Sequence, residues 1–137
     1  MACWLVKSEP SAWSWSDHFK VRVAEWDGVR NHQANNNMKA MKGGDLAFFY
    51  NSVTVKSMVG ILQVVKEHYP DHTDPSGKFG MVDFKALFPV KKPVSLADIK
   101  ANKSLADFQL LRQTRLSVLP VPDKHWKIIC RMADVET

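Results

Sequence analysis

The chain has 137 residues, of which 45% are hydrophobic, and a formal net charge of +5 at neutral pH. This length fits one domain with one core over residues 1–137, and the short apolar runs exclude a transmembrane helix. No block of five or more like charges is present, which excludes a basic tail. Cys3 and Cys130 each lie among apolar residues, which is typical of buried thiols in an intracellular protein, and we expect a cytoplasmic location.

Three strands and two helices are expected in the first half of the chain. The strands are Cys3–Lys7, Leu46–Tyr50 and Ser57–His68, which are rich in β-branched and aromatic residues. A short helix begins after Ser14, because Asp17 three residues later completes a capping box. A second helix covers Gln33–Met41 and ends before Gly43 and Gly44.

The second half begins with a polar loop over Tyr69–Gly80 and then alternates short elements. The expected strands are Met81–Val94, bent near Pro89, and Arg115–Val118; the expected helix starts are Ser95–Asp98, Ser104–Asp107 and the segment from Pro122 to Cys130. Strands separated by short helices, without regular strand–helix alternation, predict an α+β fold. We expect a small curved or closed antiparallel sheet, flanked by short helices.

The segment Trp26-Asp27-Gly28-Val29-Arg30-Asn31 is the strongest candidate for a binding site. It combines an aromatic ring, an acid, a glycine, a base and an amide, and it has neither helix nor strand periodicity. Ordered loops of this kind often bind a ligand. The alternative is an irregular turn in which Trp26 enters the core and Arg30 pairs with Asp27.

Several chemistries lack their usual patterns. Gly43-Gly44 does not have the spacing of a phosphate-binding loop, and the five histidines are dispersed, so neither a metal nor a cofactor is expected. No base is placed to activate either cysteine. Glu9, Glu25 and Asp27 could act as a carboxylate pair only if folding brought them together. The sequence therefore favours a protein that is not an enzyme.

Six segments, taken in order, resemble the EVE domain, a member of the PUA-like superfamily related to the YTH domains that read methylated adenine. The matching segments are Trp4–Pro10, Trp26–Asn31 with Gln33-Ala34, Gly44–Ser52, Val59–Ile61, Arg115–Val118 and Pro120-Val121. The resemblance covers nearly the whole chain. It implies a PUA-like fold, with a curved β-barrel-like sheet flanked by short helices.

The resemblance also implies a role in nucleic-acid binding. EVE domains resemble readers that hold a flipped, modified base, such as a modified cytosine in DNA or RNA, in a pocket. Relatives occur alone or fused to nucleases; the length of this chain favours a reader without its own nuclease, and the resemblance allows an effector nuclease or another protein as a partner in trans. Many relatives have Arg where this chain has Asn35, which removes one phosphate contact.

A flipped base needs a surface to stack on and groups that match its edge. Trp26 is the expected stacking surface, and Asn31 offers both a donor and an acceptor. The other candidates for the base pocket are Ser8, Ser52, Tyr50 and the backbone at Leu116. Each has a structural alternative: a core ring for Trp26 and Tyr50, a loop cap for Asn31, and strand-end caps for the serines.

The expected phosphate contacts are Arg30, Lys7, Lys39 and Arg115, with Lys42 nearby. For any one of them the alternative is a solvated surface charge. Two other functions remain open. An enzyme acting on a modified base would use Glu9 or Asp27 as a buried acid or base with a raised pKa. A protein-interaction module would instead expose an apolar patch over Trp13–Trp15.

Overall fold

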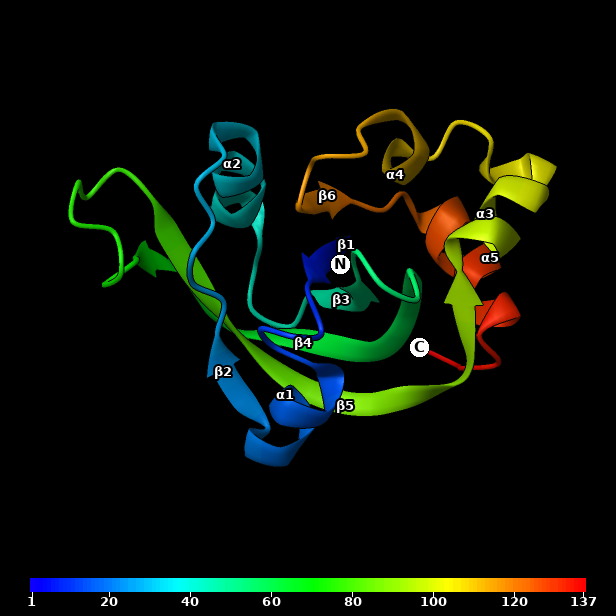
Figure 1. Cartoon of the computed structure of the whole chain (residues 1–137), viewed down its shortest axis with the longest axis horizontal. Coiled ribbons are helices and arrows are strands. Elements are labelled where there is room, and N and C mark those ends of the chain that lie inside the picture. Colours follow the sequence, from blue (N-terminus) through cyan, green and yellow to red (C-terminus); the bar gives the residue numbers. More distant parts are fainter.

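A curved six-stranded sheet forms the centre of the molecule, with five short α-helices around it (Figure 1). The computed structural model describes residues 1–137. The strands are β1 (Cys3–Ser8), β2 (Val23–Glu25), β3 (Leu46–Asn51), β4 (Ser57–Pro70), β5 (Gly80–Ser95) and β6 (Val118–Pro120). The helices are α1 (Trp15–Val21), α2 (His32–Ala40), α3 (Leu96–Ala101), α4 (Gln109–Arg112) and α5 (Asp123–Met132), with one 3₁₀ turn at Lys103–Leu105.

The spatial order of the strands is β2-β5-β4-β3-β1-β6. The α+β class is confirmed. The expectation of a fully antiparallel sheet is wrong at one place, because β1 runs parallel to β3. The sheet curves without closing, so β2 and β6 remain as its two edges. The periodicity of the sequence does not indicate that the sheet stays open between these edges.

The long hairpin of β4 and β5 gives the sheet its curvature. Its ladder is interrupted at four places, one of them beside the pair formed by Gly60 and Pro89. Irregularities of this kind bend a strand and increase its twist, and they confirm the bend that Pro89 predicts. The helices α3, α4 and α5 gather beyond one end of the hairpin, whereas α2 stands near its other end (Figure 1).

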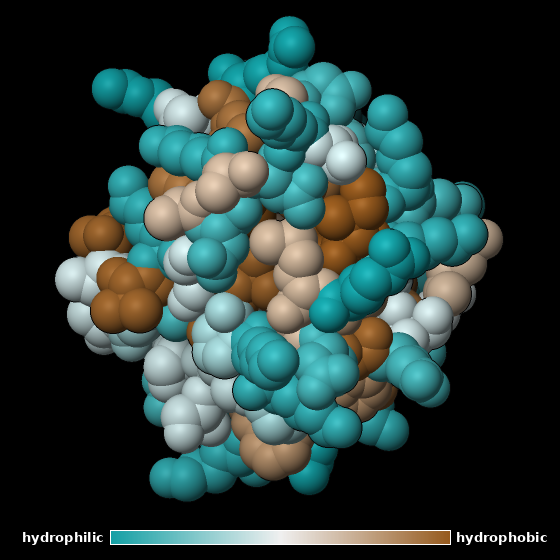
Figure 2. All heavy atoms as spheres, turned by 90° about the vertical axis from the view of Figure 1, so that its right-hand side faces the viewer, coloured by the Kyte–Doolittle hydropathy of each residue, from teal (hydrophilic) through white to brown (hydrophobic).

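Aromatic side chains pack on both sides of the curved sheet. Phe48 and Phe49 point to opposite sides of β3 and both are fully buried. Trp126 of α5 stacks on Phe48 with 4.0 Å between ring centroids. Phe49 meets Trp26 edge to face at 5.6 Å. None of the helices has the length and apolar character that a membrane span requires. The face that carries α3 and α5 is mostly hydrophilic, with small hydrophobic patches between the polar groups (Figure 2).

Two of the three predicted helix caps are confirmed. Ser14 and Ser95 each form a capping box, with Asp17 and Asp98 respectively. The cap predicted at Ser104 is wrong.

The 3₁₀ turn begins two positions earlier than that cap would require, because Asn102 is its N-cap and accepts the Ser104 amide with its side chain. Asp107 contacts His125 of α5 at 3.2 Å instead of a helix N-terminus. The strand predicted at Arg115–Val118 begins only at Val118 and runs to Pro120. An edge strand tolerates a proline because the outer side of the strand needs no backbone N–H donor.

Candidate nucleic-acid interface

A cleft of about 850 Å³ lies between the end of β1 and the segment that runs from β2 toward α2. The cleft opens between the two edges of the curved sheet, with β2 on one side and β1 beside β6 on the other. Its wall consists of Lys7, Ser8, Glu9, Ala12, Trp13, Val23, Ala24, Glu25, Trp26, Asp27, Gly28, Val29, Arg30, Asp83 and Ser117. Of the predicted site residues, the structure brings four to this cleft: Trp26, Ser8, Lys7 and Arg30.

Trp26 forms part of the cleft wall and part of the core. Its ring meets Phe49 and Phe84 edge to face, each at 5.6 Å, and the residue is 7% exposed. Its amide donates to the carbonyl of Val82 at 2.8 Å, which extends the β2–β5 pairing by one residue. The structural alternative for Trp26 and the predicted stacking role are therefore compatible, because a ring packed in the core can also form part of a cleft wall.

Trp13 is a second aromatic residue in the wall, and a buried histidine positions it. The Trp13 indole donates to Nδ1 of His18 at 3.1 Å, so Nε2 of His18 carries the proton and donates to the carbonyl of Phe84 at 2.8 Å. Burial lowers the pKa of His18, although its hydrogen bond to Phe84 opposes the shift. His18 thus connects α1 to β5 as a neutral ring. The sequence offered no signal for this role.

Asp71 does not line the cleft, but it holds two wall residues, Gly28 and Arg30, in place. Its side chain is fully buried and contacts Arg30 at 3.0 Å, and it accepts the amide of Gly28 at 2.9 Å. Gly28 adopts a φ of +82°, which glycine reaches without steric cost. Burial would raise the pKa of Asp71, but hydrogen bonds from Thr73, Gly28 and Arg30 outweigh it and hold the pKa well below its usual value.

Arg30 therefore pairs with Asp71 of the β4–β5 loop. The turn alternative predicts a pair with Asp27, and that prediction is wrong. It also donates to the hydroxyl of Thr73 at 2.9 Å, and its side chain is 39% exposed. The loop predicted at Tyr69–Gly80 is confirmed for residues 71–79, since β4 continues to Pro70 and β5 begins at Gly80. This loop supplies the structural anchor of the candidate site. Sequence reasoning missed Asp71 because the loop has no motif that links it to Arg30, forty-one positions away.

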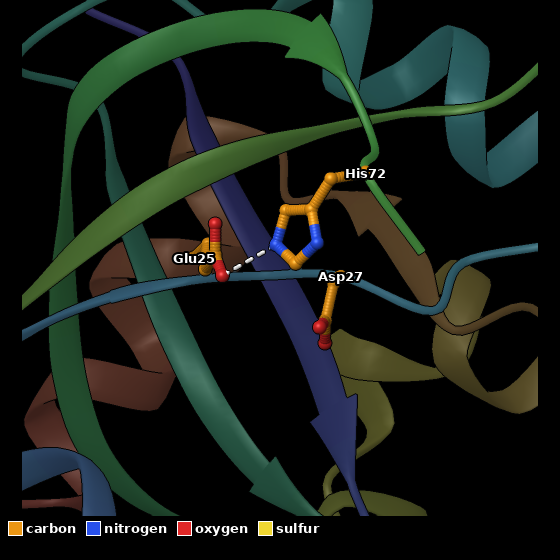
Figure 3. A group of neighbouring side chains, drawn as sticks. All are labelled: Glu25, Asp27 and His72. Atoms are coloured by element: carbon orange, nitrogen blue, oxygen red, sulfur yellow. Dashed lines mark hydrogen bonds and ion pairs between the residues drawn. The ribbon is translucent and has the colours of Figure 1, made fainter. Parts of the chain in front are cut away.

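Glu25, Asp27 and His72 meet at the rim of the cleft (Figure 3). The His72 imidazole, from the β4–β5 loop, points at the Glu25 carboxylate and contacts it at 2.7 Å. This contact raises the pKa of His72. One ligand atom from each of the three side chains lies within 4.8 Å of the others, so this donor set could hold a divalent cation. All three side chains are exposed.

A smaller hollow of about 320 Å³ adjoins the cleft and collects three more predicted residues. Asn31, Arg115 and Leu116 line it. The Asn31 carbonyl oxygen caps α2 by accepting the Ala34 amide at 2.9 Å, as the structural alternative predicted. The Leu116 amide already donates to the Gln113 carbonyl at 3.1 Å and is not free to read a base.

Three predicted residues, Tyr50, Ser52 and Lys39, line neither hollow. Tyr50 is buried in β3, as its core alternative predicted. Ser52 donates its amide to the carbonyl of Ser8, and Lys39 lies exposed near the end of α2.

Two other residues of interest have structural contacts. Lys7 donates from Nζ to the carbonyl of Thr114 at 2.9 Å while lining the cleft. Burial and the neighbouring Lys56 lower its pKa. Asn35, which stands where many relatives have Arg, is buried and accepts the Gly80 amide at 3.0 Å.

The two alternative functions find little support in this geometry. Glu9 and Asp27 are both exposed, whereas the enzyme alternative requires a buried acid. Trp13 and Trp15 are half-buried and pack against the core instead of forming an exposed apolar patch. A concave wall is present where the interaction alternative expected a flat one.

Known proteins are similar to this chain in sequence and in architecture. Thymocyte nuclear protein 1 of Homo sapiens is 33% identical over 97% of this chain and 74% of that relative. An NMR structure of a protein from Rhodopseudomonas palustris is 50% identical, with a TM-score of 0.92, over 98% of this chain and 94% of its own. The crystal structure of human THYN1 protein in complex with 5-methylcytosine containing DNA is 32% identical, with a TM-score of 0.91, over all of both chains. Residues 2–132 match the family described as EVE domain. The chain belongs to the EVE domain family.

Proposed function

We propose that this protein is a non-enzymatic reader that binds nucleic acid and holds a flipped, modified base in the cleft between β1 and β2, with a modified cytosine as the first candidate. The observation that carries the proposal is the similarity to a human relative crystallised with 5-methylcytosine containing DNA. The cleft adds a chemical reason, because it offers two indole rings and several polar groups in one concavity.

In this proposal Trp26 and Trp13 supply apolar ring surface for the base, which stacking on an aromatic residue stabilises by ~1–3 kcal/mol. Ser8 offers a polar group at the end of β1. Arg30 keeps part of its guanidinium in solvent and supplies a phosphate contact next to its bond with Asp71. Arg115 and Asn31 line the adjoining hollow, where the neighbouring nucleotide would lie.

The kind of nucleic acid, the cellular location and the protein partners belong to the proposal as well. DNA is supported by the human relative, and RNA by the superfamily resemblance alone. A cytoplasmic location and an effector nuclease or other protein acting in trans stay predictions.

The test is a tryptophan fluorescence titration with oligonucleotides that differ only at one central cytosine, plain or 5-methylated, in single- and double-stranded form. Each is run at about 50 mM and about 200 mM salt, because binding to phosphates alone weakens steeply over this range. A preference for the modified base that persists at the higher salt supports a reader. Binding that ignores the modification and disappears with salt would mean a basic surface and no base pocket.

A further inference from the structure

The cleft is negative although the chain as a whole is positive. The carboxylates in its wall are Glu9, Glu25, Asp27 and Asp83, and the cationic side chains are Lys7 and Arg30. Arg30 is bound at 3.0 Å to Asp71, a fully buried carboxylate outside the wall. The positive charge that this pair could offer to a ligand is therefore largely compensated within the protein.

Two of these acids occupy an unfavourable arrangement. Glu25 and Asp83 are direct partners in the antiparallel pairing of β2 and β5, where two like charges destabilise the sheet. The Tyr69 hydroxyl donates to Asp83 at 2.5 Å, and His72 contacts Glu25. Burial and Asp83 raise the pKa of Tyr69, which keeps this hydroxyl neutral and donating.

Asp27 follows two positions after Glu25, so its carboxylate adds a third negative charge along the same edge. It lines the cleft without a hydrogen bond or an ion pair to the protein. The repulsion among these acids is therefore only partly compensated by protein groups, and a positive charge placed in the cleft would relieve it.

The two indole rings point to the shape of that cation. Trp13 and Trp26 line the same cleft as the carboxylates, and an indole attracts a cation over its face more strongly than other aromatic rings do. Carboxylates also accept hydrogen bonds from the exocyclic amino group of cytosine. An acidic, indole-lined cleft therefore complements a flat, positively charged ring that carries an amino group.

We propose that the cleft selects bases with a formal positive charge, alkylated at a ring nitrogen, such as 3-methylcytosine or 1-methyladenine. This inference rests on the proposed function and names its ligand class. In such a base the charge is delocalised over the ring and its amino group, so it interacts with the indoles and the carboxylates at once. The phosphates remain at the rim of the cleft, between the exposed part of Arg30 and Arg115 in the adjoining hollow.

The experiment compares four single-stranded DNA oligonucleotides that differ at one central base: cytosine, 5-methylcytosine, 3-methylcytosine and 3-methyluracil. The last has the methyl group at the same ring position as 3-methylcytosine but no charge and no amino group. Fluorescence anisotropy at about 150 mM salt gives each affinity, under conditions where exposed charges are screened beyond ~8 Å. We expect 3-methylcytosine to bind at least tenfold more tightly than the other three.

Tighter binding of 5-methylcytosine than of both 3-methylcytosine and plain cytosine would overturn the inference and leave the proposed function standing. Equal affinity for all four would overturn both. Asp27→Asn removes one charge of the cleft at an exposed position that makes no hydrogen bond or ion pair, and it should reduce the preference for 3-methylcytosine over 5-methylcytosine severalfold. Glu136→Gln removes the same charge from the exposed C-terminal segment and should leave that preference unchanged. A preference that Asp27→Asn does not alter would contradict the role of the carboxylates.

Discussion

Arg30 and Asp71, forty-one positions apart, form an ion pair of 3.0 Å that fastens the β4–β5 loop to the wall of the cleft. The carboxylate is completely buried and also accepts the Gly28 amide, so one side chain fixes both the position of Arg30 and the left-handed turn before it. The loop is therefore a structural part of the site.

Replacing Asp71 with Asn should lower the free energy of unfolding by about 1–3 kcal/mol, because hydrogen bonds to a charged group contribute about that much and a buried partner would be left poorly satisfied. Urea denaturation measures the change. Asp27→Asn, at an exposed position of the same cleft, is the matched control and should shift stability by less than about 0.5 kcal/mol. Equal stability of Asp71→Asn and the wild type would mean that the loop is not anchored through this carboxylate.

The acid limb of the stability curve should also depend on Asp71. Its folded-state pKa lies below the unfolded value of about 3.9, so the stabilisation is present above that pH and is lost as the pH falls through the folded pKa. Wild type should therefore lose its advantage over Asp71→Asn as the pH is lowered from about 4. Thermal melts of the two proteins between pH 7 and pH 2 test this; parallel curves would contradict it.

His72 should titrate above the usual histidine value of about 6.5, because the Glu25 carboxylate stabilises its protonated form. The pair then contributes stability below pH 6.5, and this contribution is lost as the pH rises through the folded-state pKa. An NMR titration of the imidazole resonances gives the pKa directly. In Glu25→Gln the pKa should fall toward 6.5, and a value that the substitution leaves unchanged would rule out the ion pair as its cause.

Trp26→Ala should destabilise the fold by about 3–5 kcal/mol, because it removes a large ring packed against Phe49 and Phe84. A binding loss in that variant would be ambiguous. Trp26→Phe keeps an aromatic ring in the core and should lose less stability while weakening base binding. If Trp26→Phe binds modified oligonucleotides as tightly as wild type, the indole is a core residue only.

Gly60→Ala should cost about 1–3 kcal/mol, since an added Cβ would lie 2.4 Å from the Trp15 indole and the core would be overpacked. Gly43→Ala is a useful control because the nearest atom to its Cβ would be Glu67 Oε2 at 3.8 Å. Urea denaturation of both variants should show a large loss of stability only for Gly60→Ala. If Gly60→Ala lost as little stability as the control, Trp15 would be free to move away from the sheet.

The sequence predicted most elements correctly where the signal is local. Ser14 and Ser95 each have an acid three residues later, and both caps form. At Ser104 the same pattern fails, because Asp107 finds a tertiary partner in His125 and Asn102 caps the turn instead. A capping pattern does not reveal competitors from another part of the chain.

The candidate site divides in the same way. Trp26 and Arg30 lie on one contiguous segment and both line the cleft, whereas Asn31, only one residue further, lines the adjoining hollow and caps α2. Asp71 and His18 could not be found from the sequence, because each acts through contacts across the sheet. The β2 strand was also missed, since three residues are too few to show an alternating pattern.

The most direct test of the account is an NMR experiment that follows backbone amides and indole N–H groups during titration with an oligonucleotide that carries one modified cytosine. The account predicts that the largest shifts occur at the Trp13 and Trp26 indoles and over residues 23–30, and that an unmodified oligonucleotide produces smaller ones. Shifts confined to a separate hollow, around Lys91 and Arg131, or identical shifts with both oligonucleotides, would contradict a base-binding cleft between β1 and β2.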